Sequence, residues 1–232
     1  MLMKLLYEGK SKKVYEFSKD EVILEFKDSA TAFNAQKHQE FKNKGKINCL
    51  FSEFFFKLLS ENGIKNHFIR KLNDNQILCR KVEILKVELV IRNIATGSIT
   101  KRLGIESGFE FEEPLIEFFY KDDKLNDPNI CKEHIKILKL ASVEEVKAIE
   151  IIAFKSNEIL KEFFKKFNLR LVDIKFEFGR YNNEIILADE ISPDVFRVWD
   201  KFGNSYDKDV FRFEKGSLIE TYEKLGKMIG IL

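Results

Sequence analysis

Acidic and basic side chains alternate with bulky apolar ones in the segment LVDIKFEFG, residues 171–179. In an extended chain its apolar side chains point one way, while Asp173, Lys175 and Glu177 point the other way. A polar turn and a second apolar run follow, and that run ends at Asp189 and a neighbouring glutamate. A hairpin of these two strands would gather several carboxylates around one lysine. Carboxylate oxygens at this density are typical of a Mg²⁺ site that shares its ion with phosphate, and a charged edge strand is the alternative.

The register of this hairpin decides whether Asp189 can share an ion with Glu177. A two-residue turn at Asn182-Asn183 would pair Glu177 with Ala188 and point Asp189 toward the apolar face. A shared metal needs both carboxylates on one face. We therefore expect an odd-numbered loop or a β-bulge in this hairpin. A regular two-residue hairpin with Asp189 buried among phenylalanines would contradict the metal assignment.

A glycine-led turn near the N-terminus carries two lysines. Gly9 is followed by Lys10, Ser11 and Lys12, between two segments that read as strands. Backbone N–H groups and ammonium groups on such a turn could bind a polyphosphate. The spacing differs from that of a P-loop, and an ordinary basic hairpin is the alternative.

The segment RNIATGSITKRLG, residues 92–104, is a second candidate anion site. A strand ends here, Gly97 frees the backbone, and Ser98 occupies the position of an N-cap for a short helix. Free N–H groups at a helix start, a hydroxyl group and Arg92 would together bind phosphate well. A capped helix with a structural arginine is the alternative.

The remaining pattern predicts an α+β chain with two lobes. A β-rich N-terminal lobe, residues 1–83, would hold a nucleotide against a mixed α/β C-terminal lobe, residues 84–232. Strands are predicted within 1–30 and 64–94, helices over 47–59, 142–167 and from 217, and loops over 31–46 and 105–141.

Composition restricts the class of protein further. The chain has 232 residues, of which 34% are charged, and a formal net charge of +2, so it has no basic surplus for nucleic acid. No apolar stretch approaches the length of a membrane span. Cys49, Cys79 and Cys131 are widely spaced and read as reduced thiols. We therefore expect a cytoplasmic protein without nucleic-acid or membrane partners.

Seven segments of the chain, in order, resemble motifs of the phosphoribosylaminoimidazole-succinocarboxamide synthase (SAICAR synthetase) family. Ser11 occupies a position where this family often has alanine. The segments are YEGKSKKVY (7–15), KGKIN (44–48), RNIATGSITKRLG (92–104), PLIEFFYKDDKLNDP (114–128), LVDIKFEFG (171–179), LADEISPD (187–194) and DKDVFR (207–212).

The resemblance implies a fold related to ATP-grasp enzymes, with an N-terminal lobe like the small lobe of protein kinases. It also implies a reaction in which ATP, L-aspartate and carboxyaminoimidazole ribonucleotide (CAIR) give SAICAR, ADP and phosphate, with Mg²⁺ as cofactor. An acyl phosphate of CAIR would be the intermediate. The family is commonly dimeric or larger, so a homodimer or larger homo-oligomer is expected. Another ATP-dependent small-molecule kinase or ligase on the same fold is the alternative.

The resemblance further implies roles for single residues. Glu177 and Asp189 match the Mg²⁺ ligands, and Lys175 would neutralise charge on the transferred phosphoryl group. Asp173 would orient Lys175 or contact a substrate, so Asp173, Lys175 and Glu177 form the implied catalytic set. The residues implied for ATP binding are Lys10, Ser11, Lys12, Val14, Val22, Lys81 and Ile84, and those implied for the other substrates are Arg92, Ser98, Lys121, Asp127 and Arg197.

Overall fold

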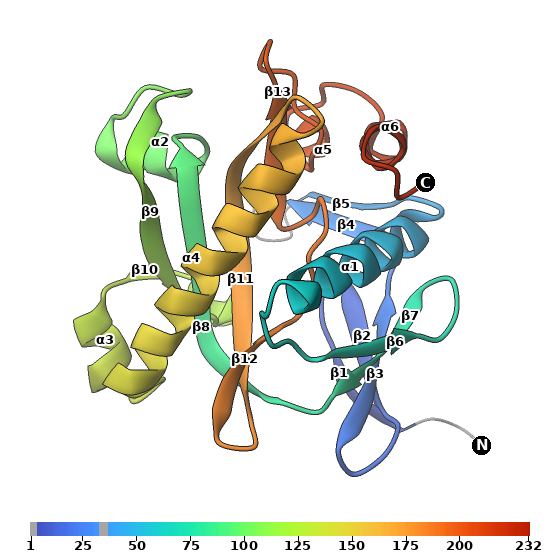
Figure 1. Ribbon diagram of the computed structural model, residues 1–232, viewed down its shortest axis with the longest axis vertical. Coiled ribbons are helices and arrows are strands. Elements are labelled where there is room, and N and C mark those ends of the chain that lie inside the picture. Colours follow the sequence, from blue (N-terminus) through green and yellow to red (C-terminus); the bar gives the residue numbers. More distant parts are fainter. Residues whose placement is uncertain (1–3, 33–36) are drawn as a thin grey trace.

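The computed structural model describes residues 4–32 and 37–232. Two antiparallel sheets, one after the other along the chain, form the framework (Figure 1). The first sheet has the strand order β1-β2-β3-β7-β6. Its strands are β1 (Leu5–Glu8), β2 (Lys12–Glu16), β3 (Glu21–Phe26), β6 (Phe68–Lys71) and β7 (Gln76–Arg80).

The second sheet is built around the alternating strand of the sequence analysis. That strand, β11, pairs with β8, β12 and β13 in a sheet of order β10-β9-β8-β11-β12. The strands are β8 (Glu83–Ile94), β9 (Glu110–Tyr120), β10 (Asn129–Ile130), β11 (Leu169–Tyr181), β12 (Glu184–Ala188) and β13 (Phe196–Asp200). A small separate hairpin consists of β4 (Ser29–Ala32) and β5 (Lys37–Glu40).

Two long helices cover the sheets. Helix α1 packs on β3, β6 and β7, and α4 packs on β8, β11 and β12, as Figure 1 shows. The helices are α1 (Lys44–Glu61), α2 (Ser98–Leu103), α3 (Lys132–Ile137), α4 (Val143–Lys165), α5 (Asp209–Arg212) and α6 (Leu218–Met228), with a 3₁₀ turn, η1 (Asp123–Leu125). Within the described ranges, no helix is long and apolar enough to cross a membrane.

An aromatic cluster joins the two halves of the molecule. The ring of Phe55 on α1 lies 5.5 Å from that of Phe164 on α4 and 5.8 Å from that of Phe196 on β13. All three side chains are buried. Aromatic contacts of this kind add about 0.5–1.5 kcal/mol each beyond the area they bury. The cluster therefore holds the two halves, and the space between them, in a fixed relation.

The α+β fold class is confirmed, and most predicted elements are present. Two predicted loops are wrong in part. Residues 31–46 include the end of β4, the whole of β5 and the start of α1, although residues 33–36 lie outside the described ranges. Residues 105–141 contain β9, whose alternation is weak because it lies near the sheet edge, with only the two-residue β10 beyond it.

Helix α1 begins three residues earlier than the sequence pattern predicts. Gly45 belongs to its first turn, and a Cβ atom at this position would lie 2.4 Å from the carbonyl oxygen of Phe26. The glycine therefore allows close contact between the helix start and β3. Its lysine-rich surroundings suggest a loop, but Gly45 lies within the helix.

The β11–β12 hairpin is regular. Glu177 pairs with Ala188 and Tyr181 with Glu184, so the loop contains only Asn182 and Asn183. Both asparagines have positive φ angles, 48° and 61°, which suit a two-residue type I′ turn. The expectation of an odd-numbered loop or a bulge in this hairpin is therefore wrong. Asparagine tolerates the left-handed conformation, so the turn needs no extra residue.

Candidate functional site

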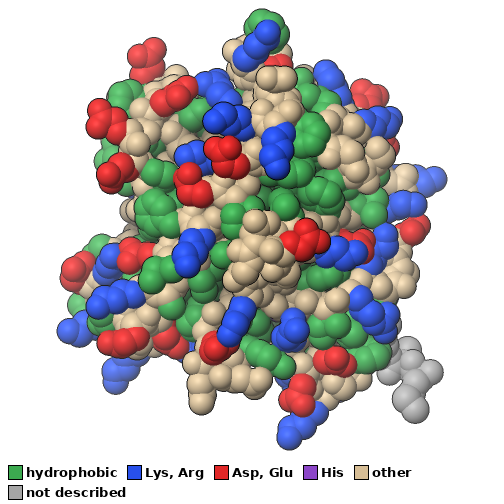
Figure 2. Space-filling view, in the orientation of Figure 1, with side chains coloured by type: hydrophobic (Ala, Val, Ile, Leu, Met, Phe, Trp, Pro, Cys, Tyr) green, Lys and Arg blue, Asp and Glu red, His purple; other side chains and the backbone are tan. Residues whose placement is uncertain are grey.

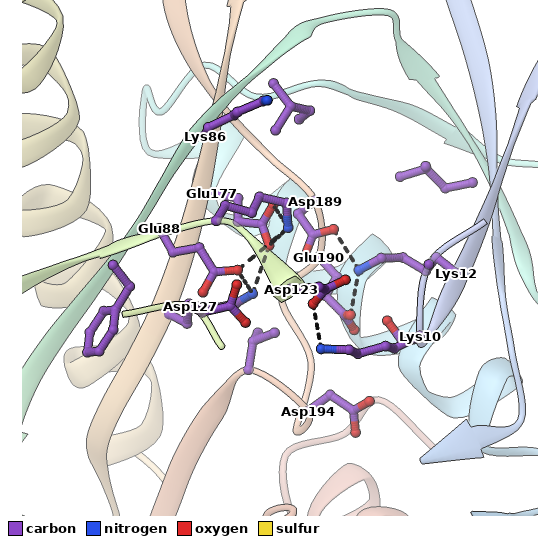
Figure 3. Close-up of a pocket in the computed structure, with 18 of the residues that line it drawn as sticks. Lys10, Lys12, Lys86, Glu88, Asp123, Asp127, Glu177, Asp189, Glu190 and Asp194 are labelled. Atoms are coloured by element: carbon purple, nitrogen blue, oxygen red, sulfur yellow. Dashed lines mark hydrogen bonds and ion pairs between the residues drawn. The ribbon is translucent and has the colours of Figure 1, made fainter. Parts of the chain in front are cut away.

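A cavity of about 1110 Å³ lies between the two sheets. All sixteen side chains that the resemblance singled out line it, and they come from both sheets and from the loops between strands. A volume of this size exceeds that of most single-ligand pockets and leaves room for more than one substrate. Figure 3 shows the charged part of the cavity, where Lys10 and Lys12 reach toward carboxylates on segments that follow strands of the second sheet.

Two paired strands hold a buried cluster of carboxylates and lysines. Glu177 on β11 lies opposite Glu88 on β8. The ammonium of Lys175 lies 2.7 Å from Glu177 and 2.8 Å from Glu88, and that of Lys121 lies 2.9 Å from Glu177. Burial raises the pKa of Glu177, but Lys175, Lys121 and Lys12 outweigh it and hold that pKa well below its usual range. Glu177 is therefore ionised at neutral pH.

Lys12 connects the first sheet to the end of β12. Its ammonium lies 2.7 Å from Asp189 and 2.5 Å from Glu190 (Figure 3). Backbone hydrogen bonds reinforce this junction, because the His67 N–H donates to the Leu187 carbonyl at 2.9 Å. The lysine of the N-terminal turn is thereby held against the acidic end of the hairpin.

Asp189 reaches the cavity by a change of backbone conformation. Strand β12 ends at Ala188, and Asp189 has a φ angle of 65°, in the left-handed region. This interrupts the alternation of side chains, so the Asp189 carboxylate lines the same cavity as Glu177 although the hairpin register is regular. The condition that would contradict the metal assignment, Asp189 buried among phenylalanines, is not met. Aspartate is one of the few residue types that accept this conformation readily.

The charge of this cluster suits a bound cation. Its carboxylates are Glu88, Glu177, Asp189 and Glu190, and its lysines are Lys12, Lys121 and Lys175, which leaves one net negative charge. Within the described ranges, no group of three or more acidic, histidine or cysteine side chains converges on a ready metal site. Mg²⁺ is usually bound by one or two carboxylates together with substrate phosphates and waters. The residues present therefore fit such an ion when phosphates accompany it.

The second anion site centres on Asp173. This carboxylate accepts hydrogen bonds from Arg92 and Arg197, each at 2.7 Å. Arg92 also donates to Glu117 at 2.6 Å and to the Ser98 hydroxyl at 3.3 Å. The expectation that Asp173 orients Lys175 is wrong, because the acceptors of that lysine are glutamates of the neighbouring cluster. Asp173 instead fixes the two arginines.

Gly97 shapes this site through its backbone. Its φ and ψ angles are 68° and −129°, and it precedes α2 as the N-cap in place of Ser98. A Cβ atom here would lie 2.9 Å from the Arg197 guanidinium. Because Ser98 does not cap the helix, its hydroxyl remains available to Arg92 and to a ligand.

Part of the cavity wall is apolar. Val14, Val22 and Ile84 line it, and the link between the sheets at Lys81 runs along it. Lys10 is nearby and pairs with Asp123 of η1 at 2.5 Å. These are residues that the family resemblance implies for ATP binding, and the structure brings them into one cavity.

Several lining residues were not predicted as site residues. Glu88 shares a strand face with Arg92, which is a detectable local signal, but Glu190 had no predicted role. Further lining residues without a predicted role include a buried histidine, His67, and the charged residues Arg80, Asp194, Lys208 and Arg212. Burial lowers the pKa of His67 to about 4, so it is neutral at pH 7.

The fold and cavity together define an ATP-grasp-like class, in which a β-rich half and an α/β half enclose a charged site. The SAICAR synthetase family model matches residues 5–229. The chain belongs to the SAICAR synthetase family.

Relatives of high identity agree with this membership. The phosphoribosylaminoimidazole-succinocarboxamide synthase of Persephonella marina is 51% identical over 222 residues, which are 95% of this chain and 93% of the relative. A solved SAICAR synthetase (Type-2) in complex with ADP is 49% identical, with a TM-score of 0.95 and 97% of each chain covered. The corresponding enzyme of Ehrlichia chaffeensis is 40% identical, with a TM-score of 0.95 and 99% of each chain covered.

Proposed function

We propose that this protein joins L-aspartate to the carboxylate of CAIR and forms SAICAR, ADP and phosphate. The observation that carries the proposal is that every side chain implied by the family resemblance lines one cavity. Membership of the family over residues 5–229 supports the same reaction. The relative solved in complex with ADP supports a nucleotide site in this chain.

The two sheets suggest how the substrates share the cavity. The proposed lobes are residues 1–83 and 84–232, and the chain passes between their sheets at Lys81 and Val82. The adenine of ATP would lie against the apolar side chains of Val14, Val22 and Ile84, with its phosphates toward the acidic cluster. CAIR would lie with its 5′-phosphate or carboxylate at Arg92, Ser98 and Arg197.

The lysines of the site would bind the transferred phosphoryl group. Lys10 and Lys12 would exchange their carboxylate partners for ATP phosphates, and Lys175 would stabilise charge on the phosphoryl group as it moves. Glu177 and Asp189 would hold Mg²⁺, which supplies charge neutralisation for the phosphates when bound. Lys121, beside Glu177, and Asp127 are further proposed contacts to substrate.

The proposed chemistry has two steps. A CAIR carboxylate oxygen bonds to the γ-phosphorus of ATP, and ADP leaves. The aspartate amine then forms a C–N bond to the activated carbon, the C–O bond to the phosphoryl group breaks, phosphate leaves with the electron pair, and the amine releases a proton. The work of the protein is to position the groups and to neutralise charge.

Two further properties are part of the proposal. We expect a homodimer or larger homo-oligomer, which sedimentation analysis of the purified protein can test. We also expect a cytoplasmic location, in line with the three cysteines, all of which are free thiols. Figure 2 shows basic and acidic side chains intermixed over one face of the molecule.

One assay tests the reaction. ADP release and SAICAR formation are measured with ATP, Mg²⁺ and CAIR, with and without L-aspartate. We expect SAICAR only when aspartate is present. ADP release without any need for aspartate, and with no SAICAR formed, would instead indicate a small-molecule kinase.

A further inference from the structure

Glu117 contacts the second anion site from outside the cavity. It lies on β9, next to β8 in the sheet, and it is not among the residues that line the cavity. Its side chain is only 8% exposed. A buried carboxylate needs partners from the protein, and the carboxylate of Glu117 accepts hydrogen bonds from two arginines of the segment 92–104.

Glu117 and Asp173 together orient the Arg92 guanidinium. Its Nε donates to Glu117 at 2.6 Å, and its Nη1 donates to Asp173 at 2.7 Å. Two carboxylates on two nitrogens fix the orientation of this planar group. Among the described residues, Nη2 has one acceptor, the Ser98 hydroxyl at 3.3 Å. Nη2 carries two N–H groups, so one remains for an anion in the cavity, and Glu117 helps to determine where it points.

Glu117 also holds helix α2 through Arg102. Arg92 donates to Oε2 of Glu117, whereas Nη2 of Arg102 donates to Oε1. Arg102 donates in addition to the Asn129 side chain on β10 at 3.0 Å. Helix α2 has six residues, too few to be stable alone, and its first residue is Ser98. The contact between Arg102 and Glu117 therefore helps to set the position of the Ser98 hydroxyl in the site.

The charge of Glu117 allows an effect on position to be separated from an effect on attraction. Removal of this negative charge would make the site more positive, so Coulomb attraction alone would strengthen anion binding. Loss of the hydrogen bonds would instead let Arg92 and α2 shift, which would weaken anion binding. The two effects have opposite signs, so a measurement of affinity distinguishes them.

We propose that Glu117 is a positioning residue, which holds Arg92 and α2 in the arrangement that binds the anionic group of CAIR. The inference rests on the proposed function, which supplies CAIR as the ligand of Arg92, Ser98 and Arg197. Glu117 acts on binding and not on the reacting atoms, because it lies outside the cavity. Its replacement should therefore change the KM for CAIR more than the turnover at saturating CAIR.

Glu117→Gln tests the inference, with Glu110→Gln as the matched control. Glutamine has nearly the same size as glutamate, but its amide has one acceptor oxygen for two arginines. Glu110 is on the same strand and pairs with Arg170 at 2.6 Å, and both lie outside the cavity. We expect Glu117→Gln to raise the KM for CAIR about tenfold, with the KM for ATP and the kcat at saturating CAIR changed less than about twofold. Glu110→Gln should behave as wild type.

A merely structural role would give a different result. It would lower the amount of folded enzyme, and hence the apparent kcat, without changing the KM for CAIR. An unchanged or lowered KM for CAIR in Glu117→Gln would therefore overturn the inference.

Arg102→Met tests the contact with α2 separately. Arg102 does not line the cavity, and its side chain is 34% exposed, so this variant should fold even if Glu117→Gln does not. We expect about a threefold rise in the KM for CAIR, which is smaller because Arg92 keeps its contact with Glu117. A wild-type KM for CAIR in Arg102→Met would overturn the role assigned to α2.

A binding measurement separates this inference from the proposed reaction. Calorimetry follows binding of CAIR, in the presence of ADP and Mg²⁺, to wild type, Glu117→Gln and Glu110→Gln. Weaker binding in Glu117→Gln alone supports the inference even if no SAICAR forms in any assay, a result that would overturn the proposed function alone. Equal or tighter binding in Glu117→Gln, together with normal SAICAR formation by the wild type, would overturn the inference alone.

Discussion

The ammonium of Lys12 lies 2.7 Å from the carboxylate of Asp189 and joins a turn of the first sheet to the end of a strand in the second. Burial lowers the pKa of Lys12, but Asp189 and Glu190 outweigh burial and raise it. The lysine is therefore charged at neutral pH and acts as the counter-ion of the acidic cluster. Binding of a nucleotide phosphate with its metal would require Lys12 to exchange its carboxylate partners for phosphate oxygens.

Asp189→Asn tests the metal assignment without disturbing the backbone. Asparagine accepts the left-handed φ of 65° but lacks the charge that a Mg²⁺ ligand needs. Loss of an outer partner of a metal site typically lowers activity roughly 10–100-fold, so loss of a direct ligand should lower it by at least that much. Turnover is measured as a function of Mg²⁺ concentration, and we expect the apparent Mg²⁺ affinity to fall.

Asp189→Ala is the matched control for the backbone. Alanine also removes the carboxylate, but in the left-handed region it costs about 1–2 kcal/mol of strain that asparagine avoids. Chemical denaturation should therefore find Asp189→Ala less stable than Asp189→Asn, with similarly low turnover. Wild-type Mg²⁺ dependence in Asp189→Asn would contradict the metal assignment.

Gly97→Ala should weaken CAIR binding. The added Cβ would lie 2.9 Å from the Arg197 guanidinium, and the backbone there has a φ of 68° that alanine rarely adopts. Arg197 would have to move from the proposed phosphate site. We expect the KM for CAIR to rise about tenfold while that for ATP changes little.

Gly108→Ala separates backbone strain from displacement of Arg197. Gly108 also has a positive φ, 94°, but a Cβ at that position would have open space around it. Both variants should lose about 1–3 kcal/mol of stability to backbone strain. Only Gly97→Ala should alter the KM for CAIR, and an equal rise in both variants would show that displacement of Arg197 is not the cause.

Local patterns in the sequence are sufficient to predict many of the helices and strands. The alternation in β11 and the apolar stripe of α4 arise from the periods of strand and helix, which neighbouring residues alone can reveal. The segment that forms β9 reads as a loop because Glu112, Glu113 and Pro114 interrupt its alternation, which a strand near a sheet edge tolerates.

The site was harder to predict in detail, because pairing between distant segments creates it. Glu88 joins Glu177 only because β8 is the neighbour of β11, and no local pattern specifies that neighbour. Lys208 reaches the cavity from the position just before the short helix α5, which follows the last strand of the sheet. The direction of the Asp189 side chain depends on where β12 ends. The left-handed φ angle of this one residue turns its carboxylate toward the cavity.

Asp173→Asn should both destabilise the protein and disturb the arginine site. Asp173 is 3% exposed and accepts from Arg92 and Arg197, so its loss leaves buried guanidinium groups without their shared counter-ion. Removal of one partner of a buried ion pair typically costs about 3–5 kcal/mol. Urea denaturation measures the stability, and the KM for CAIR should rise in parallel.

Asp74→Asn provides the surface comparison for Asp173→Asn. Asp74 forms an exposed pair with Lys46 at 3.0 Å, which water screens, so its loss should change stability little. If Asp173→Asn had the same urea midpoint as Asp74→Asn, the buried arginine site would not depend on this carboxylate.

His67→Gln should make stability less sensitive to acid. Burial is the largest cause that lowers the pKa of His67 from 6.5 to about 4, with Lys12 acting in the same direction and Asp189 opposing it. Between these pH values the unfolded chain binds a proton that the folded chain does not. The contribution of His67 is therefore complete above pH 6.5 and declines as the pH falls toward 4. The difference of about 2.5 units between the unfolded and folded pKa corresponds to about 3 kcal/mol of folding stability.

The pH dependence of stability must be compared between variants and wild type. Asp207 changes the stability of the folded chain in the opposite direction to His67 as the pH falls. Burial raises the pKa of Asp207 to about 6, so its folded state gains relative stability as the pH falls from 6 toward 4. Urea midpoints at pH 7.5 and pH 4.5 are compared for wild type, His67→Gln and the exposed control His38→Gln. We expect a smaller loss at pH 4.5 in His67→Gln and a wild-type loss in His38→Gln. Equal losses in all three proteins would mean that His67 is not held neutral by its burial.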